Sequence, residues 1–124
     1  MFGDSGPEKL NHPTTCILYQ NMFLIADGDN CIKFFDQSGT CLYKLGKPGN
    51  QDGQFNWLNG MLVDSSNNLL VCDCDNNRIQ QFSLDGRLTG KSITRLPCPT
   101  GIVTAPDGRI LVISCTAKKV YILK

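Results

Sequence analysis

The feature that most constrains the fold is an internal repeat of 41 residues. The stretch that begins at Leu58 aligns without a gap on the stretch that begins at Pro99. Glycines and apolar residues coincide in this alignment: Gly60 with Gly101, Val71 with Val112, Ile79 with Val120 and Phe82 with Leu123. A period in the low forties is typical of four-stranded propeller blades, although some helical repeats share it.

The start of the chain supplies a third copy of the repeat, from Pro13. Ile25 aligns with Val71 at an offset of 46, and Phe35 aligns with Phe82 at an offset of 47. The offset changes because the turn after Asp27 is one residue shorter than its counterpart. Together the three copies cover nearly the whole chain.

Strand signals decide between the two kinds of repeat. Short apolar runs at 69–72 and 110–113 are bounded by turn residues, and residues 78–84 loosely alternate apolar with polar side chains. No window holds a helical stripe of ten or more residues. Each copy is therefore predicted to form strands a, b, c and d, which in the second copy lie near 60–64, 69–73, 78–83 and 87–93.

These signals predict an all-β chain of about three propeller blades with eleven strands. Blade 1 spans about 10–46, blade 2 about 55–94, and blade 3 about 96–124 without its outer strand. Residues 2–6 resemble residues 45–49, so a loop between blades is expected there. Three blades do not close a ring. We therefore expect exposed apolar flanks, covered by a longer propeller or by a second copy.

Composition narrows the function classes. The net charge of +1 gives no global attraction to nucleic acid. No apolar run reaches the roughly 18 residues of a membrane span. The opening residues lack the charged and apolar regions of a signal peptide, so we expect no membrane association and a cytoplasmic location. The seven cysteines form an odd count, and we expect buried thiols in a reducing compartment.

The stretch from Cys72 to Arg78 raises the question of a metal site. Cys72 and Cys74 flank Asp73, but a closed site needs further ligands, and His12, the single histidine, precedes the first strand. We expect no metal and no cofactor. Asp73 and Arg78 instead flank the b–c turn and are positioned to bridge it, which predicts a structural turn beside two buried thiols.

A binding platform is the function that the loops favour. The long connection 46–56 and the shorter connection 92–97 should lie on the same face as the b–c turns. Phe55 is expected to pack beneath its loop as a buried aromatic residue. The candidate binding residues on this face are Lys47, Trp57, Asn76, Arg78, Arg95, Lys118 and Lys119.

The second copy resembles the NHL repeat, a propeller-blade family. It has a lead at 49–55 that ends in Gly-Gln-Phe, a strand at 60–64 that ends in Asp, and a strand that ends in Asp73. Asn-Asn-Arg-Ile at 76–79 then opens the next strand. The third copy has Ser114 and Lys119 where Asp and Arg are usual. The first copy lacks the glycine and the arginine.

The resemblance implies a function as well as a fold. NHL propellers usually close at six blades, so two copies of this chain would complete a ring as a homodimer. In tripartite-motif proteins, related propellers recruit protein or RNA, and a separate RING domain makes the protein a ubiquitin ligase. The resemblance places that RING domain outside this chain. The resemblance thus implies a non-catalytic module that recruits a protein partner or a ubiquitination substrate.

Two alternatives stay open at this point. Single-stranded or hairpin RNA is the second candidate ligand, since basic residues are few and acidic residues are interspersed among them. Peptide-amidating lyases also resemble NHL propellers, but they use metal bound by histidines and keep disulfides. A chain with one histidine cannot supply that site alone.

Overall fold

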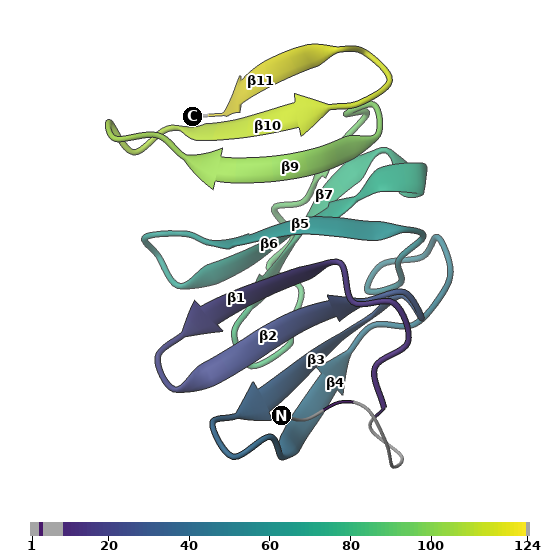
Figure 1. Cartoon of the computed structure of the whole chain (residues 1–124). Helices are drawn as coiled ribbons and strands as arrows, with labels where there is room; N and C mark the ends of the chain where they lie inside the picture. The colour runs from purple at the N-terminus through teal and green to yellow at the C-terminus, as the bar shows by residue number, and fades with distance from the viewer. Residues whose placement is uncertain (1–2, 4–8, 124) are drawn as a thin grey trace.

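Three antiparallel sheets stacked on one another form the molecule in a computed structural model, which describes residue 3 and residues 9–123 (Figure 1). The prediction of an all-β chain with eleven strands is confirmed for these residues. The loop expected at 2–6 lies, apart from Gly3, outside the described residues. No helix in the described part of the chain is long and apolar enough to cross a membrane.

Each sheet is one blade, and consecutive strands pair within it. Blade 1 contains β1 (Thr15–Tyr19), β2 (Met22–Asp27), β3 (Cys31–Asp36) and β4 (Cys41–Leu45). Blade 2 contains β5 (Leu58–Val63), β6 (Asn68–Asp73), β7 (Arg78–Ser83) and β8 (Ile93–Thr94), with a 3-10 turn η1 (Cys74–Asn76) between β6 and β7. Blade 3 contains β9 (Pro99–Thr104), β10 (Ile110–Ser114) and β11 (Lys119–Leu123).

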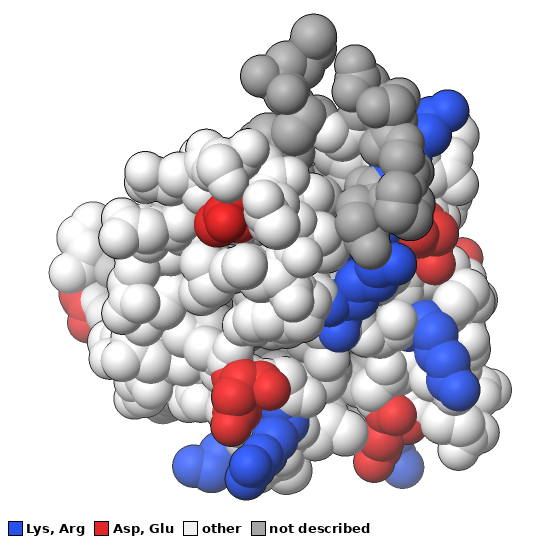
Figure 2. Space-filling view, turned by 90° about the horizontal axis from the view of Figure 1, so that it is seen from below, with Lys and Arg blue, Asp and Glu red and all other residues white. Residues whose placement is uncertain are grey.

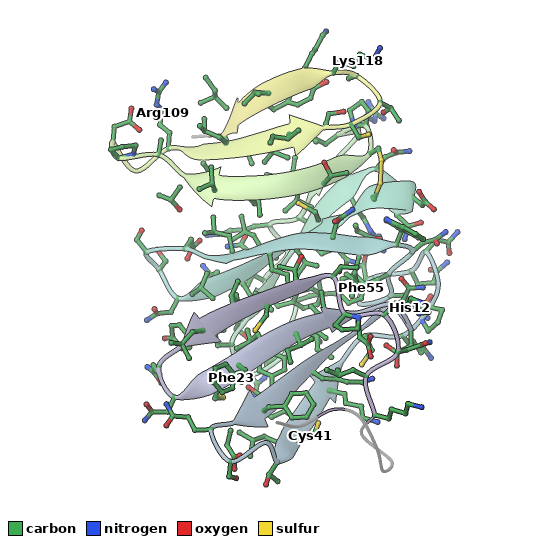
Figure 3. All side chains as sticks on the ribbon, in the orientation of Figure 1. His12, Phe23, Cys41, Phe55, Arg109 and Lys118 are labelled. Atoms are coloured by element: carbon green, nitrogen blue, oxygen red, sulfur yellow. A yellow bond between two sulfur atoms is a disulfide. The ribbon has the colours of Figure 1, made fainter. Side chains whose placement is uncertain are left out.

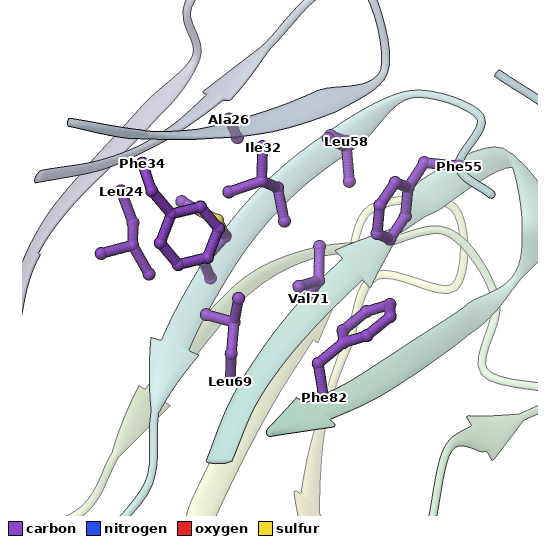
Figure 4. Close-up of a cluster of buried hydrophobic side chains, with 10 residues drawn as sticks. Leu24, Ala26, Ile32, Phe34, Phe55, Leu58, Leu69, Val71 and Phe82 are labelled. Atoms are coloured by element: carbon purple, nitrogen blue, oxygen red, sulfur yellow. The ribbon is translucent and has the colours of Figure 1, made fainter. Parts of the chain in front are cut away.

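The apolar second strand of blade 2 is buried on both faces. Because side chains alternate along a strand, Leu69 and Val71 of β6 face blade 1, whereas Leu70 and Cys72 face blade 3. Figure 4 shows the first of these cores, in which blade 1 and blade 2 meet. Its buried members are Leu24, Ala26, Ile32, Phe34, Phe55, Leu58, Met61, Leu69, Val71 and Phe82.

The glycine that the repeat preserves lets two blades approach closely. A Cβ atom added to Gly60 in β5 would lie 2.9 Å from the carbonyl oxygen of Thr100 in β9. Any larger residue at this position would therefore push the innermost strands of blades 2 and 3 apart. Phe55 is buried in the core between blades 1 and 2, so its expected packing role is present in the structure.

The outer strand of blade 2 is shorter than its sequence suggests. Residues 87–93 were expected to form it, but only β8 at Ile93–Thr94 and an isolated bridge between Phe82 and Leu88 pair with β7. Gly86 and Gly90 adopt φ angles of 91° and 79°. Such positive angles turn the chain out of the extended conformation, which is why the run does not continue as one strand.

The two flanks of the stack differ in exposure. The outer face of blade 3 exposes more than half of Val103, Ile113, Val120 and Ile122. The corresponding face of blade 1 is buried at Ile25 and Phe35, which are 6% and 1% exposed, whereas Leu18 of β1 on the same face is 63% exposed. The ammonium of Lys33 on that face donates to the carbonyl oxygen of Lys9, so the segment before β1 reaches over it. The expected open apolar flank is thus present on blade 3 and is limited to the first strand on blade 1.

Candidate binding site at the loop face

The connections between blades and the b–c turns gather at one end of the stack, which we call the loop face. It is formed by residues 46–57, residues 95–98 and the b–c turns at 28–30, 74–77 and 115–118. In Figure 3, the labels of His12, Phe55 and Lys118 lie at this end, and that of Arg109 lies at the opposite end. The two kinds of connection share one face, as expected from the sequence.

A buried carboxylate organises this face in blade 2. Asp73 at the end of β6 is 0% exposed, and its Oδ1 accepts the backbone N–H of Asn56 at 2.8 Å. Its Oδ2 accepts from Arg78 Nε at 2.8 Å, Asn76 Nδ2 at 3.0 Å and Gln80 Nε2 at 3.2 Å. Such a set of donors compensates the carboxylate for the water that it loses on burial.

The side chains around Asp73 also hold the preceding loop. Arg78 Nη2 donates to the carbonyl oxygens of Gln51 and Gln54, each at 2.8 Å. The Gln80 amide donates to Gln54 O at 2.7 Å and accepts the Gly53 N–H at 3.0 Å. Arg78 is only 9% exposed. Its guanidinium therefore supports the loop and presents little surface to a ligand.

Blade 1 repeats this arrangement with a different cation. Asp27, 1% exposed, accepts the backbone N–H groups of Asn11, His12 and Gly28 and the Lys33 ammonium at 2.7 Å. Lys33 pairs with Ile25 in the ladder and Gln80 pairs with Val71, so Lys33 holds the register position of Gln80. In the first copy, which lacks the arginine, Lys33 thus supplies the cation for the buried carboxylate from a different strand position.

The pKa values of this pair are shifted in opposite directions. Burial raises the pKa of Asp27, but the Lys33 ammonium and the three backbone donors outweigh it and leave the pKa below its usual range. Burial lowers the pKa of Lys33, but hydrogen bonds to Asp27 and Asp29 outweigh it and leave the pKa above its usual range. Both groups are therefore charged near neutral pH.

Blade 3 lacks the carboxylate. Ser114 takes its place, donates its hydroxyl to the carbonyl oxygen of Pro97 and accepts the backbone N–H of Ala117 at 3.2 Å. Lys119 stands at the position of Arg78 and is exposed. The departures of the third copy from the repeat thus change its turn from an ionic arrangement to a neutral one.

A second repeated contact joins neighbouring blades. Asn30 Oδ1 accepts the backbone N–H of Trp57 at 2.8 Å, and Asn77 Oδ1 accepts that of Cys98 at 3.0 Å. Both asparagines are left-handed, with φ angles of 62° and 53°, a conformation that asparagine tolerates well. Lys118 takes the same conformation in blade 3, with φ at 54°. Its ammonium has no acceptor atom to offer.

The contact at Asn30 places Trp57 beside a pocket between blades 1 and 2. The pocket has a volume of about 390 Å³. Trp57 is 60% exposed at its edge, and no charged side chain lines it. Its lining residues are His12, Thr14, Gly28, Asn30, Asn56, Trp57 and Leu58. The arrangement offers an apolar surface with a few amide and hydroxyl groups, which is typical of ligand sites.

The structure separates the residues that sequence reasoning grouped together. Trp57 lines the pocket, and Lys47, Arg95, Lys118 and Lys119 are exposed on the loop face. Asn76 and Arg78 instead bond to Asp73 and to the loop 49–54. Sequence reasoning did not identify four further residues that line the pocket: His12, Thr14, Asn30 and Asn56. The matching asparagines at 30 and 77 were the available signal for Asn30.

The cysteines differ from the expectation of buried thiols. Cys74 is buried but forms a disulfide with Cys98, which lies just before β9. The repeat aligns Cys74 with Cys115 and gives no indication that it pairs with Cys98, whose proximity depends on blade packing. Burial raises the pKa of Cys72 to about 12, so this residue does keep a buried thiol. Among the described residues, no three His, Cys, Asp or Glu side chains cluster as a metal site would require.

Comparison with known proteins identifies the repeat. Residues 55–82 match the family described as the NHL repeat. The protein brain tumor of Drosophila melanogaster is 30% identical over 83% of this chain and 10% of its own length. Human E3 ubiquitin-protein ligase TRIM32 is 32% identical over 90% of this chain and 21% of its own length. The chain thus spans between a tenth and about a fifth of these two relatives.

Solved structures agree on the fold. The WD40 β-propeller domain of Doa1 has a TM-score of 0.69 at 18% identity, covering 94% of this chain and 37% of that one. A catalytically inactive virginiamycin B lyase from Staphylococcus aureus with quinupristin has a TM-score of 0.72 at 17% identity, covering 91% and 38%. The protein therefore consists of β-propeller blades. It is an NHL-repeat propeller chain, similar to propellers of the tripartite-motif type, as its sequence predicted.

Replacing Arg78 by alanine should destabilise blade 2. The change leaves the buried Asp73 carboxylate without its cation, which typically costs about 3–5 kcal/mol. Unfolding in urea, monitored by circular dichroism, measures the change in the free energy of unfolding. Arg87→Ala is the matched control, because Arg87 is 84% exposed beside an exposed Asp85 and should change stability by less than about 0.5 kcal/mol. Equal effects of the two variants would contradict the role assigned to Arg78.

Proposed function

We propose that this chain is a non-catalytic module that recruits a protein partner through the loop face. The observation that carries the proposal is the uncharged pocket beside Trp57. Tryptophan is enriched among the residues that dominate binding energy at protein interfaces. An exposed tryptophan whose backbone is fixed by Asn30 offers a large apolar contact at a small entropic cost.

The relatives suggest the setting in which such recruitment would occur. The human protein TRIM32 is named as an E3 ubiquitin-protein ligase, and so is the human protein NHLRC1. Because this chain spans 21% and 25% of them, ligase activity would reside in other segments of a parent protein. We place the partner among ubiquitination substrates and the parent protein in the cytoplasm.

RNA is the second candidate ligand, favoured by the four exposed cations Lys47, Arg95, Lys118 and Lys119 on the loop face. Phosphate contacts would make that affinity strongly salt-dependent. On the blade 1 side, which Figure 2 shows, blue and red side chains are interspersed. The pocket itself carries no cation. Protein recruitment is therefore the stronger proposal.

Binding through the pocket should depend on Trp57. Peptides selected from a displayed library on the immobilised chain should bind Trp57→Ala at least about tenfold more weakly, as expected on losing a central aromatic contact. Calorimetry measures the affinity. Leu18→Ala is the control, because Leu18 is 63% exposed near the opposite end of β1. Selection of peptides that bind Trp57→Ala unchanged would contradict the proposal.

The RNA alternative has its own test. Salt-sensitive binding of hairpin RNA by the unchanged chain, lost in Lys119→Glu, would favour RNA as the ligand.

The open face of blade 3 supports a further partner, a second copy that completes a six-bladed ring. Light scattering in reducing buffer at several concentrations should then give twice the chain mass of 13.7 kDa. Val120→Glu should return the mass to one chain, because a charge would enter the apolar contact. Arg87→Glu, on the outer edge of the middle blade, should leave the dimer intact, because Arg87 is 84% exposed and lies on neither flank of the stack. A mass of one chain for the unchanged protein at all concentrations would contradict the pairing.

A further inference from the structure

A disulfide joins blade 2 to blade 3 on the loop face. It links Cys74, which opens η1, to Cys98, which directly precedes β9, and the two cysteines are 24 positions apart in the sequence. Disulfides that form in the cytoplasm, the location proposed above, are usually catalytic or redox-sensing. We propose that this disulfide is a reversible redox switch, whose two states differ in how firmly the pocket beside Trp57 is held from behind.

The packing of two blades does not require this cross-link, because the junction of blades 1 and 2 lacks one. Gly28 follows the buried carboxylate of blade 1 as Cys74 follows that of blade 2. Trp57 and Cys98 correspond in the 41-residue repeat, and both have positive φ angles, 66° and 37°. Gly28 and Trp57 thus occupy the equivalent positions without a covalent bond.

Noncovalent contacts hold the junction of blades 2 and 3 in both redox states. The N–H of Cys98 donates to Asn77 Oδ1 at 3.0 Å, and the N–H of Leu96 donates to the carbonyl oxygen of Asn77 at 3.0 Å. Between the two blades lies a cluster of buried apolar side chains: Leu70, Cys72, Ile79, Leu96 and Val112. Reduction therefore loosens the junction without separating the blades, which a reversible switch requires.

Exposure determines which sulfur atom a reductant attacks. Cys98 is partly exposed, whereas Cys74 is only 4% exposed. A thiolate from solvent therefore reaches Cys98 Sγ first, and Cys74 is the leaving group. On reoxidation the accessible Cys98 forms the mixed disulfide, and the thiolate of Cys74 then closes the cross-link.

The reagents of the switch are a glutathione-type thiol and its disulfide. A glutathione thiolate attacks Cys98 Sγ, a mixed disulfide forms, and the electron pair of the broken bond remains on Cys74, which takes a proton from water. A second glutathione thiolate attacks the glutathione sulfur of the mixed disulfide and releases Cys98, which is protonated in turn. Two glutathione thiols thus become one disulfide while the cross-link becomes two thiols, and oxidation is the reverse.

The turn that carries Cys74 holds two residues of the pocket. The N–H of Cys74 donates to the carbonyl oxygen of Trp57 at 3.1 Å, and the N–H of Asp75 donates to that of Asn56 at 3.0 Å. Trp57 and Asn56 both line the pocket. Reduction frees η1 from the segment before β9, so these two bonds open more often. The consequence for a ligand rests on the proposed function, whereas the change in the turn does not.

Thiol alkylation and amide hydrogen exchange test the switch on the whole chain. The protein is equilibrated near neutral pH in glutathione buffers that range from reduced to oxidised, and its free thiols are then trapped and mapped by mass spectrometry. Exchange of single amides is followed by NMR in the same buffers. Cys98→Ser keeps the chain in the uncrosslinked state. Cys115→Ser is the matched control, because it removes an exposed thiol of blade 3 and leaves the disulfide intact.

In the unchanged chain and in Cys115→Ser, the cross-link should open and close with the buffer. Reduction should make the amides of Cys74 and Asp75 exchange about tenfold faster, whereas those of β2 and β3 keep their protection. Cys98→Ser should show the faster exchange in every buffer. The switch is overturned if no buffer changes the state of the cross-link, if reduction unfolds the chain, or if reduction leaves these two amides unchanged.

Peptide binding distinguishes the switch from the proposed function. Trp57 is the single tryptophan of the chain, so its fluorescence reports binding of library-selected peptides in each buffer. Peptides selected on the oxidised chain should bind the reduced chain about fivefold more weakly or worse, because the pocket is less preorganised. Failure to bind in either state contradicts the proposed function alone. Equal binding in both states contradicts the effect of the switch on the pocket.

Discussion

A carboxylate that is buried at the end of the second strand is the interaction on which the loop face depends. Asp27 in blade 1 and Asp73 in blade 2 have 1% and 0% exposure, and each is surrounded by backbone and side-chain donors. A buried charge without such donors would cost several kcal/mol. In each blade some of these donors are backbone N–H groups of the segment that leads into that blade, so satisfying the charge also fixes that segment.

The fixed backbone of the segment that leads into blade 2 determines where the pocket lies. In blade 2 the Asp73 carboxylate fixes the backbone at Asn56, and Asn30 of blade 1 fixes the backbone at Trp57. Two consecutive residues are thus held by two different blades. The indole of Trp57 remains exposed because its backbone, rather than its ring, carries these bonds. The binding surface is therefore a product of how adjacent blades share their polar contacts.

The repeat made the blades predictable from sequence, because period, turns and apolar strands all indicate the same fold. The Asp73–Arg78 contact could be anticipated from its place at the turn. Lys33 could not, because its role depends on strand register rather than on its distance from Asp27 along the chain. The pocket and the Cys74–Cys98 disulfide were also unpredictable, since both form between blades whose packing no spacing rule describes.

The measurement that tests this account most directly is amide hydrogen exchange of the chain with Asp73→Asn. An asparagine keeps the size of the side chain and removes its charge, so each bond from a donor contributes about 1 kcal/mol instead of the roughly 1.5–3 kcal/mol of a bond to a charged group. The account predicts that amides of residues 49–57 exchange about tenfold faster or more, whereas those of β2 and β3 keep their protection. Unchanged protection of residues 49–57 would contradict the role of Asp73 in ordering the loop face.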